Sequence, residues 1–324
     1  MRVRRALLRL TPRCATVHRA WDEHRTTAAG TEKQRVYPDP PFSPLPVFRT
    51  VQPTVWAFDC EWVPDADAGR CLLGLDPEMP EEEVFEAMWA HAGATPDAPR
   101  PFLKTVACRV ASIAVVERRV CTSGEVALHL CALPRDADDP EDVLLTAFFD
   151  ALARRRPQLV GFNSHGADLK VLVQRGVVRG LAAPGLCRRP DRPWEGPDYF
   201  HPHSEWNVDL MRILGGRGAV CPTLHEIATL SGIPCKALDD RSTSGADVAA
   251  LWLAGRRHDI RRYNEVDAVT TYLLWLRTAR FAGLFSSEEM AEEEGRLEAL
   301  LEHHAEEGKT HLGAFLDRWR IAVA

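Results

Sequence analysis

The acidic residues Asp59 and Glu61 are the clearest candidates for chemistry in the sequence. Both lie in the apolar run Val55–Trp62, which predicts a short buried strand. Alternate side chains of a strand share one face, so the two carboxylates are expected to point the same way. Neighbouring carboxylates resist joint ionisation unless a cation lies between them, and Mg²⁺ prefers such oxygen ligands. The pair suggests a metal site, although by itself it fits a solvated strand terminus better.

A third acidic residue, Asp168, begins a predicted helix whose core positions include Leu169 and Leu172. Aspartate is a favoured capping residue at helix N-termini, which explains this position without any function. Asn163, at the end of the preceding predicted strand, could likewise simply bond a turn. This segment alone leaves a functional carboxylate and a helix cap equally open.

A fourth acidic residue, Asp267, lies four positions after Tyr263, so both side chains share one face of a predicted helix. The helix beyond Asp267 is apolar on almost every side and is expected to be buried. A buried carboxylate is costly unless it is paired or bound to a metal. Arg261 or Arg262 could be the partner, and a metal is the favoured interpretation.

In this order, the acidic segments resemble the DEDD exonucleases, in the branch whose last motif carries tyrosine. The histidine branch places His five residues before the final Asp, where this chain has Arg262. Further motifs are similar to one family, the predicted 3′→5′ exonucleases related to the proofreading domain of family-B DNA polymerases. The resemblance covers about residues 54–282. Its motifs are Asn163–Leu169, Val208–Met211, Thr223–Ala228, Gly232–Lys236, Ile260–Asp267 and Thr271–Leu273.

The resemblance implies that each active site holds two divalent cations, Mg²⁺ or Mn²⁺. Asp59 would touch both metals, and Glu61 and Asp267 would complete the site of the attacking water. Asp168 would serve the second metal through water. Tyr263 would orient the attacking water, because a neutral phenol is a better positioner than a base at pH 7.

The activity implied by the resemblance is hydrolysis of phosphodiester bonds at the 3′ ends of nucleic acid, with single-stranded DNA as the expected substrate. One alternative is a ribonuclease D-like enzyme that trims RNA 3′ ends. Another is a nucleic-acid-binding module of the same fold without catalysis. The presence of all four carboxylates and the tyrosine argues against the second alternative.

Residues that grip the substrate are harder to recognise than metal ligands. Trp62 is a candidate for stacking on the terminal base, with Trp206 as a further possibility. Exposed basic residues on helices are usually only solvated, so no single one is decisive. The candidates for substrate contact are Asn163, Lys170, Arg175, Lys236, Arg261 and Arg262. The chain departs from the family pattern at Ala167, where an aromatic residue is usual before the second Asp.

The elements that must position these residues follow an α/β pattern. Three strands come first, and strands then alternate with helices, which implies a mixed sheet. The resemblance specifies a ribonuclease H-like fold, with the first three strands antiparallel and helices on the faces of the sheet. Strands are predicted at 55–62, 105–116, 126–133 and 158–162. Helices are predicted at 82–91, 141–155, 167–178, 224–231, 246–253 and 260–280.

The chain divides into three regions by composition. Residues 1–53 form a basic, proline-rich leader that is expected to be poorly ordered. Residues 54–282 form the exonuclease-like domain, which carries an acidic insertion at about 64–102. Residues 283–324 form an acidic helical tail, expected to pack on the domain through an apolar stripe.

Composition narrows the class of protein. The 324 residues carry a formal net charge of -6, so nucleic acid would have to bind in a local groove or through metals. Nine cysteines without a C-x-x-C pair indicate neither a zinc ribbon nor a redox dithiol. No apolar run is long enough to span a membrane. A cytoplasmic protein is expected, with mitochondrial targeting by the arginine-rich start as the alternative.

Overall fold

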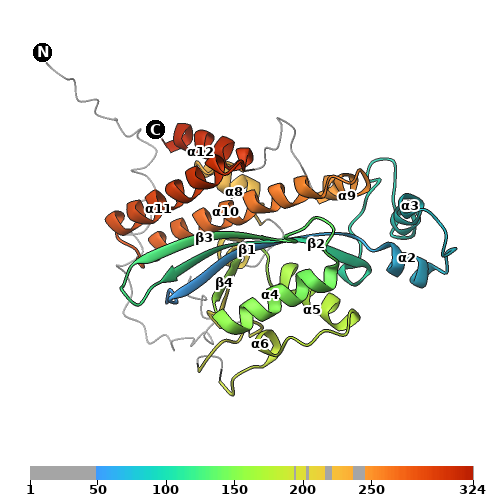
Figure 1. Cartoon of the computed structure of the whole chain (residues 1–324), viewed down its shortest axis with the longest axis horizontal. Helices are drawn as coiled ribbons and strands as arrows, with labels where there is room; N and C mark the ends of the chain where they lie inside the picture. Colours follow the sequence, from blue (N-terminus) through green and yellow to red (C-terminus); the bar gives the residue numbers. More distant parts are fainter. Residues whose placement is uncertain (1–48, 193–194, 202–203, 216–220, 236–244, 324) are drawn as a thin grey trace, which may run out of the picture. The chain divides into compact units, whose positions relative to one another are not determined.

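A five-stranded mixed sheet forms the centre of the protein in the computed structural model (Figure 1). The structure describes residues 49–192, 195–201, 204–215, 221–235 and 245–323. The predicted leader, except for its last residues, and Lys236 therefore lie outside the described residues. The strands are β1 (Thr54–Pro64), β2 (Cys108–Val120), β3 (Val126–Leu133), β4 (Gln158–Gly161) and β5 (Asn207–Asp209).

The strand order is β3-β2-β1-β4-β5. The first three strands are antiparallel, whereas β4 runs parallel to both β1 and β5. This arrangement confirms the α/β, ribonuclease H-like class predicted from the sequence. The pairing of β1 with β2 shifts register between Glu61 and Trp62, so an irregularity interrupts the ladder directly after the acidic pair.

Helices cover both faces of the sheet. In Figure 1, α10 and α11 lie on one face and α4 and α5 lie on the other. The longer helices are α2 (Ala66–Leu73), α3 (Glu81–His91), α4 (Glu141–Arg155), α5 (Asp168–Val178), α9 (Gly245–Leu253), α10 (Arg257–Phe281), α11 (Ser287–Glu306) and α12 (Thr310–Val323). The shorter ones are η1 (Thr105–Ala107), α6 (Pro184–Cys187), α7 (Leu210–Gly215) and α8 (Leu224–Leu230).

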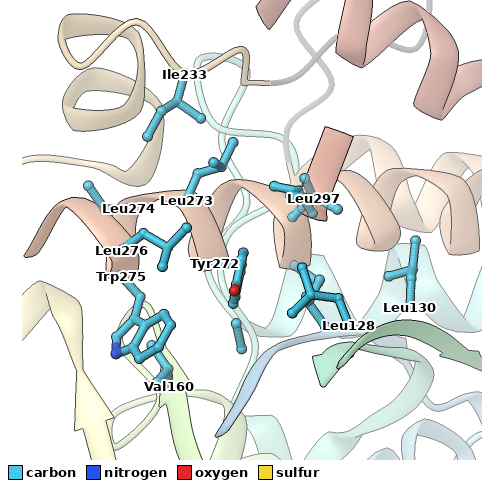
Figure 2. Close-up of a cluster of buried hydrophobic side chains, with 14 of the residues drawn as sticks. Leu128, Leu130, Val160, Ile233, Tyr272, Leu273, Leu274, Trp275, Leu276 and Leu297 are labelled. Atoms are coloured by element: carbon cyan, nitrogen blue, oxygen red, sulfur yellow. The ribbon is translucent and has the colours of Figure 1, made fainter. Parts of the chain in front are cut away.

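The main core lies between the sheet and α10, as Figure 2 shows around Tyr272 and Trp275. Residues of β1 divide between the two faces by strict alternation. Val55 and Ala57 belong to the α10 side, and Trp56, Phe58 and Cys60 belong to the α4 and α5 side. Asp59 and Glu61 continue the α10 side of this alternation. The side of the sheet that carries the acidic pair is therefore the side that α10 covers.

The predicted tail contributes to the same core. Leu297 and Leu301 of α11 and Phe315 and Trp319 of α12 are buried in the cluster that contains Trp275. The apolar stripe expected on the first tail helix is therefore present, and a second helix follows it. Within the described residues, no helix has both the length and the apolarity needed to cross a membrane.

The acidic insertion contains two helices rather than the single one predicted. Helix α2 begins after Asp65, whose carboxylate accepts a hydrogen bond from the Asp67 backbone N–H. Gly69 of α2 faces α3 so closely that a Cβ there would meet Val84 and Met88. The insertion shares an apolar cluster with α9 and with Tyr263 of α10. It thus forms one wall beside the predicted site.

Candidate active site

Three of the predicted carboxylates converge where β1 meets α10. One ligand oxygen from each of Asp59, Glu61 and Asp267 lies within 4.8 Å of the other two. Asp59 and Glu61 are half-buried, and Asp267 is buried. Three hard oxygen donors at this spacing could hold a divalent metal ion. The alternation of β1 and the burial of α10 together account for this convergence.

Asp168 reaches the same place from the other side of β1. Its Oδ1 accepts a hydrogen bond of 3.1 Å from the backbone N–H of Cys60, the residue between the acidic pair. The N-cap of α5 is Ala167, and no side chain caps this helix terminus. The capping explanation for Asp168 is therefore wrong, because its carboxylate binds the neighbouring strand. Asp168 does not belong to the group of three, and it lies close enough to affect the ionisation of Asp59.

The electrostatics of the cluster favour a bound cation. Burial, followed by the charges of Asp168, Glu61 and Asp267, raises the pKa of Asp59 well above its ordinary value. Burial likewise raises the pKa of Asp168 to about 7. Both shifts mean that the fold disfavours the negative charges that it has gathered. A divalent cation would relieve this repulsion, so the donor set fits the metal that the sequence suggested.

Tyr263 is held beside Asp267, as its place one helical turn earlier predicts. The two side chains are hydrogen-bonded, and Tyr263 is almost fully buried. Burial and the charges of Asp267 and Glu61 raise the pKa of the phenol far above its ordinary value. The hydroxyl group is therefore neutral and donates to the carboxylate. Arg261 and Arg262, the proposed alternative partners of Asp267, bind elsewhere: Arg261 donates to the backbone oxygens of Pro134 and Arg135, and Arg262 pairs with Asp259.

The predicted substrate contacts have mixed surroundings. Lys170 is exposed on α5, and Trp62 is half-buried against the cluster on the α4 and α5 side. Asn163 is half-buried and has a left-handed backbone, with φ of 66°. Arg175 is not available for phosphate, because it is buried and forms ion pairs with Asp65 and Glu141. Lys236 lies outside the described residues.

Two residues that the sequence analysis did not single out contribute to the site. Asp209 accepts hydrogen bonds from the backbone N–H groups of Asn163 and His165, and it fixes the turn that leads to Asp168. Asn264 donates a 2.7 Å hydrogen bond to Asp59. Both lie inside quoted motifs, Val208–Met211 and Ile260–Asp267, so their positions were marked although their roles were not.

Comparison with known proteins now gives the family. The profile of the family described as predicted 3′-5′ exonuclease related to the exonuclease domain of PolB matches residues 100–319, more than half of the chain. The chain belongs to this family. The matched region includes Asp168, Tyr263 and Asp267, whereas Asp59 and Glu61 precede it. No curated protein matches the chain.

A solved structure is also similar to this chain. It is the family B DNA polymerase from the hyperthermophilic archaeon Pyrobaculum calidifontis, with 19% sequence identity and a TM-score of 0.37. The alignment covers 79% of this chain and 29% of the polymerase. The chain therefore spans less than a third of the length of that enzyme.

Proposed function

We propose that this protein is a 3′→5′ exonuclease that removes nucleotides from the 3′ ends of single-stranded DNA with two divalent cations, Mg²⁺ or Mn²⁺. The observation that carries the proposal is the convergence of Asp59, Glu61 and Asp267 within 4.8 Å, with Asp168 bound to the same strand. Membership of the exonuclease family supports it.

The four carboxylates would hold the cations. Asp59, between the other acids, would contact both cations. Glu61 and Asp267 would complete the site of one cation, and Asp168 would serve the other cation through water. Bound divalent cations supply Lewis-acid chemistry, since they neutralise the phosphate and activate a water nucleophile. They also explain how a chain with a net charge of -6 could engage an anionic substrate.

Tyr263 would position the attacking water. Its phenol proton is donated to Asp267, so the phenol oxygen has lone pairs available to accept a hydrogen bond from water. The raised pKa keeps the phenol protonated, which excludes a role as the base. The cluster of α2, α3 and α9 residues packed around Tyr263 holds the ring and keeps it from bulk water.

The test is a time course on single-stranded oligonucleotides labelled at either the 5′ or the 3′ end. A 3′→5′ exonuclease shortens the 5′-labelled strand stepwise and releases the 3′ label at once as a mononucleotide. Each reaction is run with Mg²⁺, with Mn²⁺ and with a chelator. The Asp59→Ala/Asp267→Asn double variant is the control for contaminating nucleases.

The outcomes separate the alternatives. Matched DNA and RNA strands distinguish the proposed substrate from a ribonuclease D-like activity, and faster trimming of RNA would refute the DNA preference. Binding of nucleic acid without metal-stimulated hydrolysis would identify a non-catalytic module. Trimming that persists in the double variant would place the active site elsewhere.

A further inference from the structure

A buried amide connects the two elements that carry the carboxylates. Asn264 lies on α10 between Tyr263 and Asp267, and its side chain is completely buried. Its Nδ2 donates a hydrogen bond of 2.7 Å to Oδ2 of Asp59 on β1, 205 positions earlier in the chain. This is a direct link between the helix and the strand at the centre of the acidic cluster.

The oxygen of the amide faces Ser112 on β2. The Ser112 hydroxyl lies 3.1 Å from Asn264 Oδ1 and 2.9 Å from the carbonyl oxygen of Leu133. Ser112 is completely buried, and it is the residue of β2 that pairs with Glu61. If the amide were reversed, its oxygen would face the Asp59 carboxylate, and its NH₂ group would lose that acceptor. The Asp59 carboxylate, which can only accept, therefore selects the observed orientation, and the Ser112 hydroxyl lies in place to donate to the amide oxygen.

The neutral charge of the amide matters at this position, beside a carboxylate that could bind a metal ion. A lysine or arginine here would hold the Asp59 carboxylate equally well, but its positive charge would compete with a metal ion. An amide orients one carboxylate oxygen without cancelling the charge. With Oδ2 held, the plane of the carboxylate is fixed, and so is the direction in which Oδ1 points. Groups that orient metal ligands in this way commonly alter metal affinity when they are removed.

We propose that Asn264, itself held by Ser112, is a positioning residue that presets the Asp59 carboxylate for binding a divalent cation. This inference rests on the proposed function, because it assigns Asn264 a task only if Asp59 is a metal ligand. Asn264 is completely buried, so a bound substrate could not reach it from solvent. It acts through Asp59 alone.

Three variants test the inference by calorimetric titration of the full chain with Mn²⁺. Asn264→Leu keeps the size and branching of the side chain and removes both hydrogen bonds. Ser112→Ala keeps the amide and removes the hydroxyl that supports its oxygen. Thr270→Val is the matched control, because Thr270 is also completely buried on α10 and donates to the Pro234 carbonyl, away from the acidic cluster. Thermal unfolding in chelator measures the stability of each protein.

The expected result is a Mn²⁺ dissociation constant about 10- to 100-fold higher for Asn264→Leu. Ser112→Ala should show a smaller increase, and Thr270→Val should bind Mn²⁺ as the wild type does. Because the ligands themselves remain, excess Mn²⁺ should restore most of the turnover number of Asn264→Leu. A merely structural role would lower the unfolding temperature without this dependence on metal concentration.

Other outcomes overturn the inference. Wild-type Mn²⁺ affinity in Asn264→Leu refutes it, and so does an equal loss of affinity in Thr270→Val. If Asn264→Leu does not fold, unchanged affinity in Ser112→Ala refutes it. Failure of the proposed function has a different signature, in which Mn²⁺ binding by the wild type does not depend on Asp59 or no 3′ trimming occurs.

Discussion

Two buried acidic residues of α10, Glu265 and Asp267, lie two positions apart in opposite electrostatic surroundings. Glu265 faces the start of α12, where it binds Lys309, the residue before the helix, at 2.9 Å and His311 at 2.6 Å. Asp267 faces β1, where its oxygen lies within 4.8 Å of the carboxylates of Asp59 and Glu61. One helix thus carries one acid that the fold neutralises and another that it places among like charges.

The pKa values of the two acids, Glu265 and Asp59, shift in opposite directions, and this difference marks where a bound cation would relieve repulsion. The pKa of Glu265 is lowered, because hydrogen bonds from His311 and Lys309 outweigh the effect of burial. The pKa of Asp59 is raised by burial and by its acidic neighbours, although Asn264 donates to it. Burial alone is therefore not the signal of a metal site. The signal is a buried group of acids whose pKa values the fold raises rather than lowers.

Removal of a carboxylate from the acidic cluster should have the largest effect on activity. Loss of a residue that hydrogen-bonds a metal ligand typically lowers activity about 10- to 100-fold. Asp59→Ala or Asp267→Asn is expected to lower Mg²⁺-dependent trimming by more than this. The metal-free Asp267→Asn protein should be no less stable than the wild type, because repulsion is relieved, whereas Asp59→Ala also leaves the buried Asn264 amide without its acceptor. Assays of 3′ trimming and thermal unfolding in chelator measure the two effects. A clear loss of stability in Asp267→Asn would show that the cluster is a structural network.

The pH dependence of stability should have opposite signs in the two regions. The pKa of Asp168 is about 7 in the folded protein against 3.8 when unperturbed, so its stabilising contribution is complete below pH 3.8 and is lost as pH rises through 7. This contribution is on the order of 4 kcal/mol. Glu265 acts oppositely, since its contribution is present above 4.5 and is lost as pH falls through its lowered pKa.

Urea unfolding in chelator from pH 4 to pH 8 measures this dependence. The difference between wild type and Asp168→Asn should decline over that range, because the variant cannot ionise. A constant difference would contradict the raised pKa of Asp168.

Disruption of the neutralised acid should affect stability rather than chemistry. Glu265→Gln leaves Lys309 and His311 without their carboxylate, and loss of one partner from a buried pair costs about 3–5 kcal/mol. The free energy of unfolding should fall by about 3 kcal/mol, because Lys309 is 29% exposed and can reach solvent. Urea unfolding at pH 7 measures the loss. A large fall in turnover number at full Mn²⁺ saturation, without a fall in stability, would reverse the assignment of the two acids.

Replacement of the tyrosine should lower activity less than removal of a carboxylate does. Tyr263→Phe keeps the ring in its apolar cluster and removes the hydroxyl that is hydrogen-bonded to Asp267. The turnover number should fall about 100-fold, as for loss of one positioned hydrogen-bonding group. Mn²⁺ affinity should change little, since every carboxylate remains. A loss equal to that of the Asp variants would mean that Tyr263 does more than position water.

The convergence of the acidic residues was largely predictable, because the periodicity of a strand and of a helix determines which side chains share a face. The spacing of Asp59 and Glu61 needs only the alternation of a strand, and that of Tyr263 and Asp267 needs only a helical turn. The bounds of β3 and α4 agree with the predicted 126–133 and 141–155. These features can be predicted because each depends only on residues that are close in sequence.

Pairings between distant residues could not be predicted in this way. Arg175 looked like an exposed helical base, but its partners Asp65 and Glu141 lie 110 and 34 positions away. The bond between Asn264 and Asp59 is similarly remote. Strand β5 is only three residues long, too short for any period to show. Helix α2 was missed because its Gly69, unfavourable in an isolated helix, is required by close packing on α3.

The burial of Trp319 and Phe315 against the back of α10 bears on how the protein should be prepared for experiments. An expression clone that stops at residue 282 would encode Asp59, Glu61, Asp168 and Asp267 yet remove Phe285, whose ring packs edge-on against Trp275. Such a fragment would expose apolar side chains of the main core and leave Glu265 without Lys309, which directly precedes α12, and without His311 of α12. Its inactivity would say nothing about the acids themselves, so enzymology belongs on a clone that extends through α12.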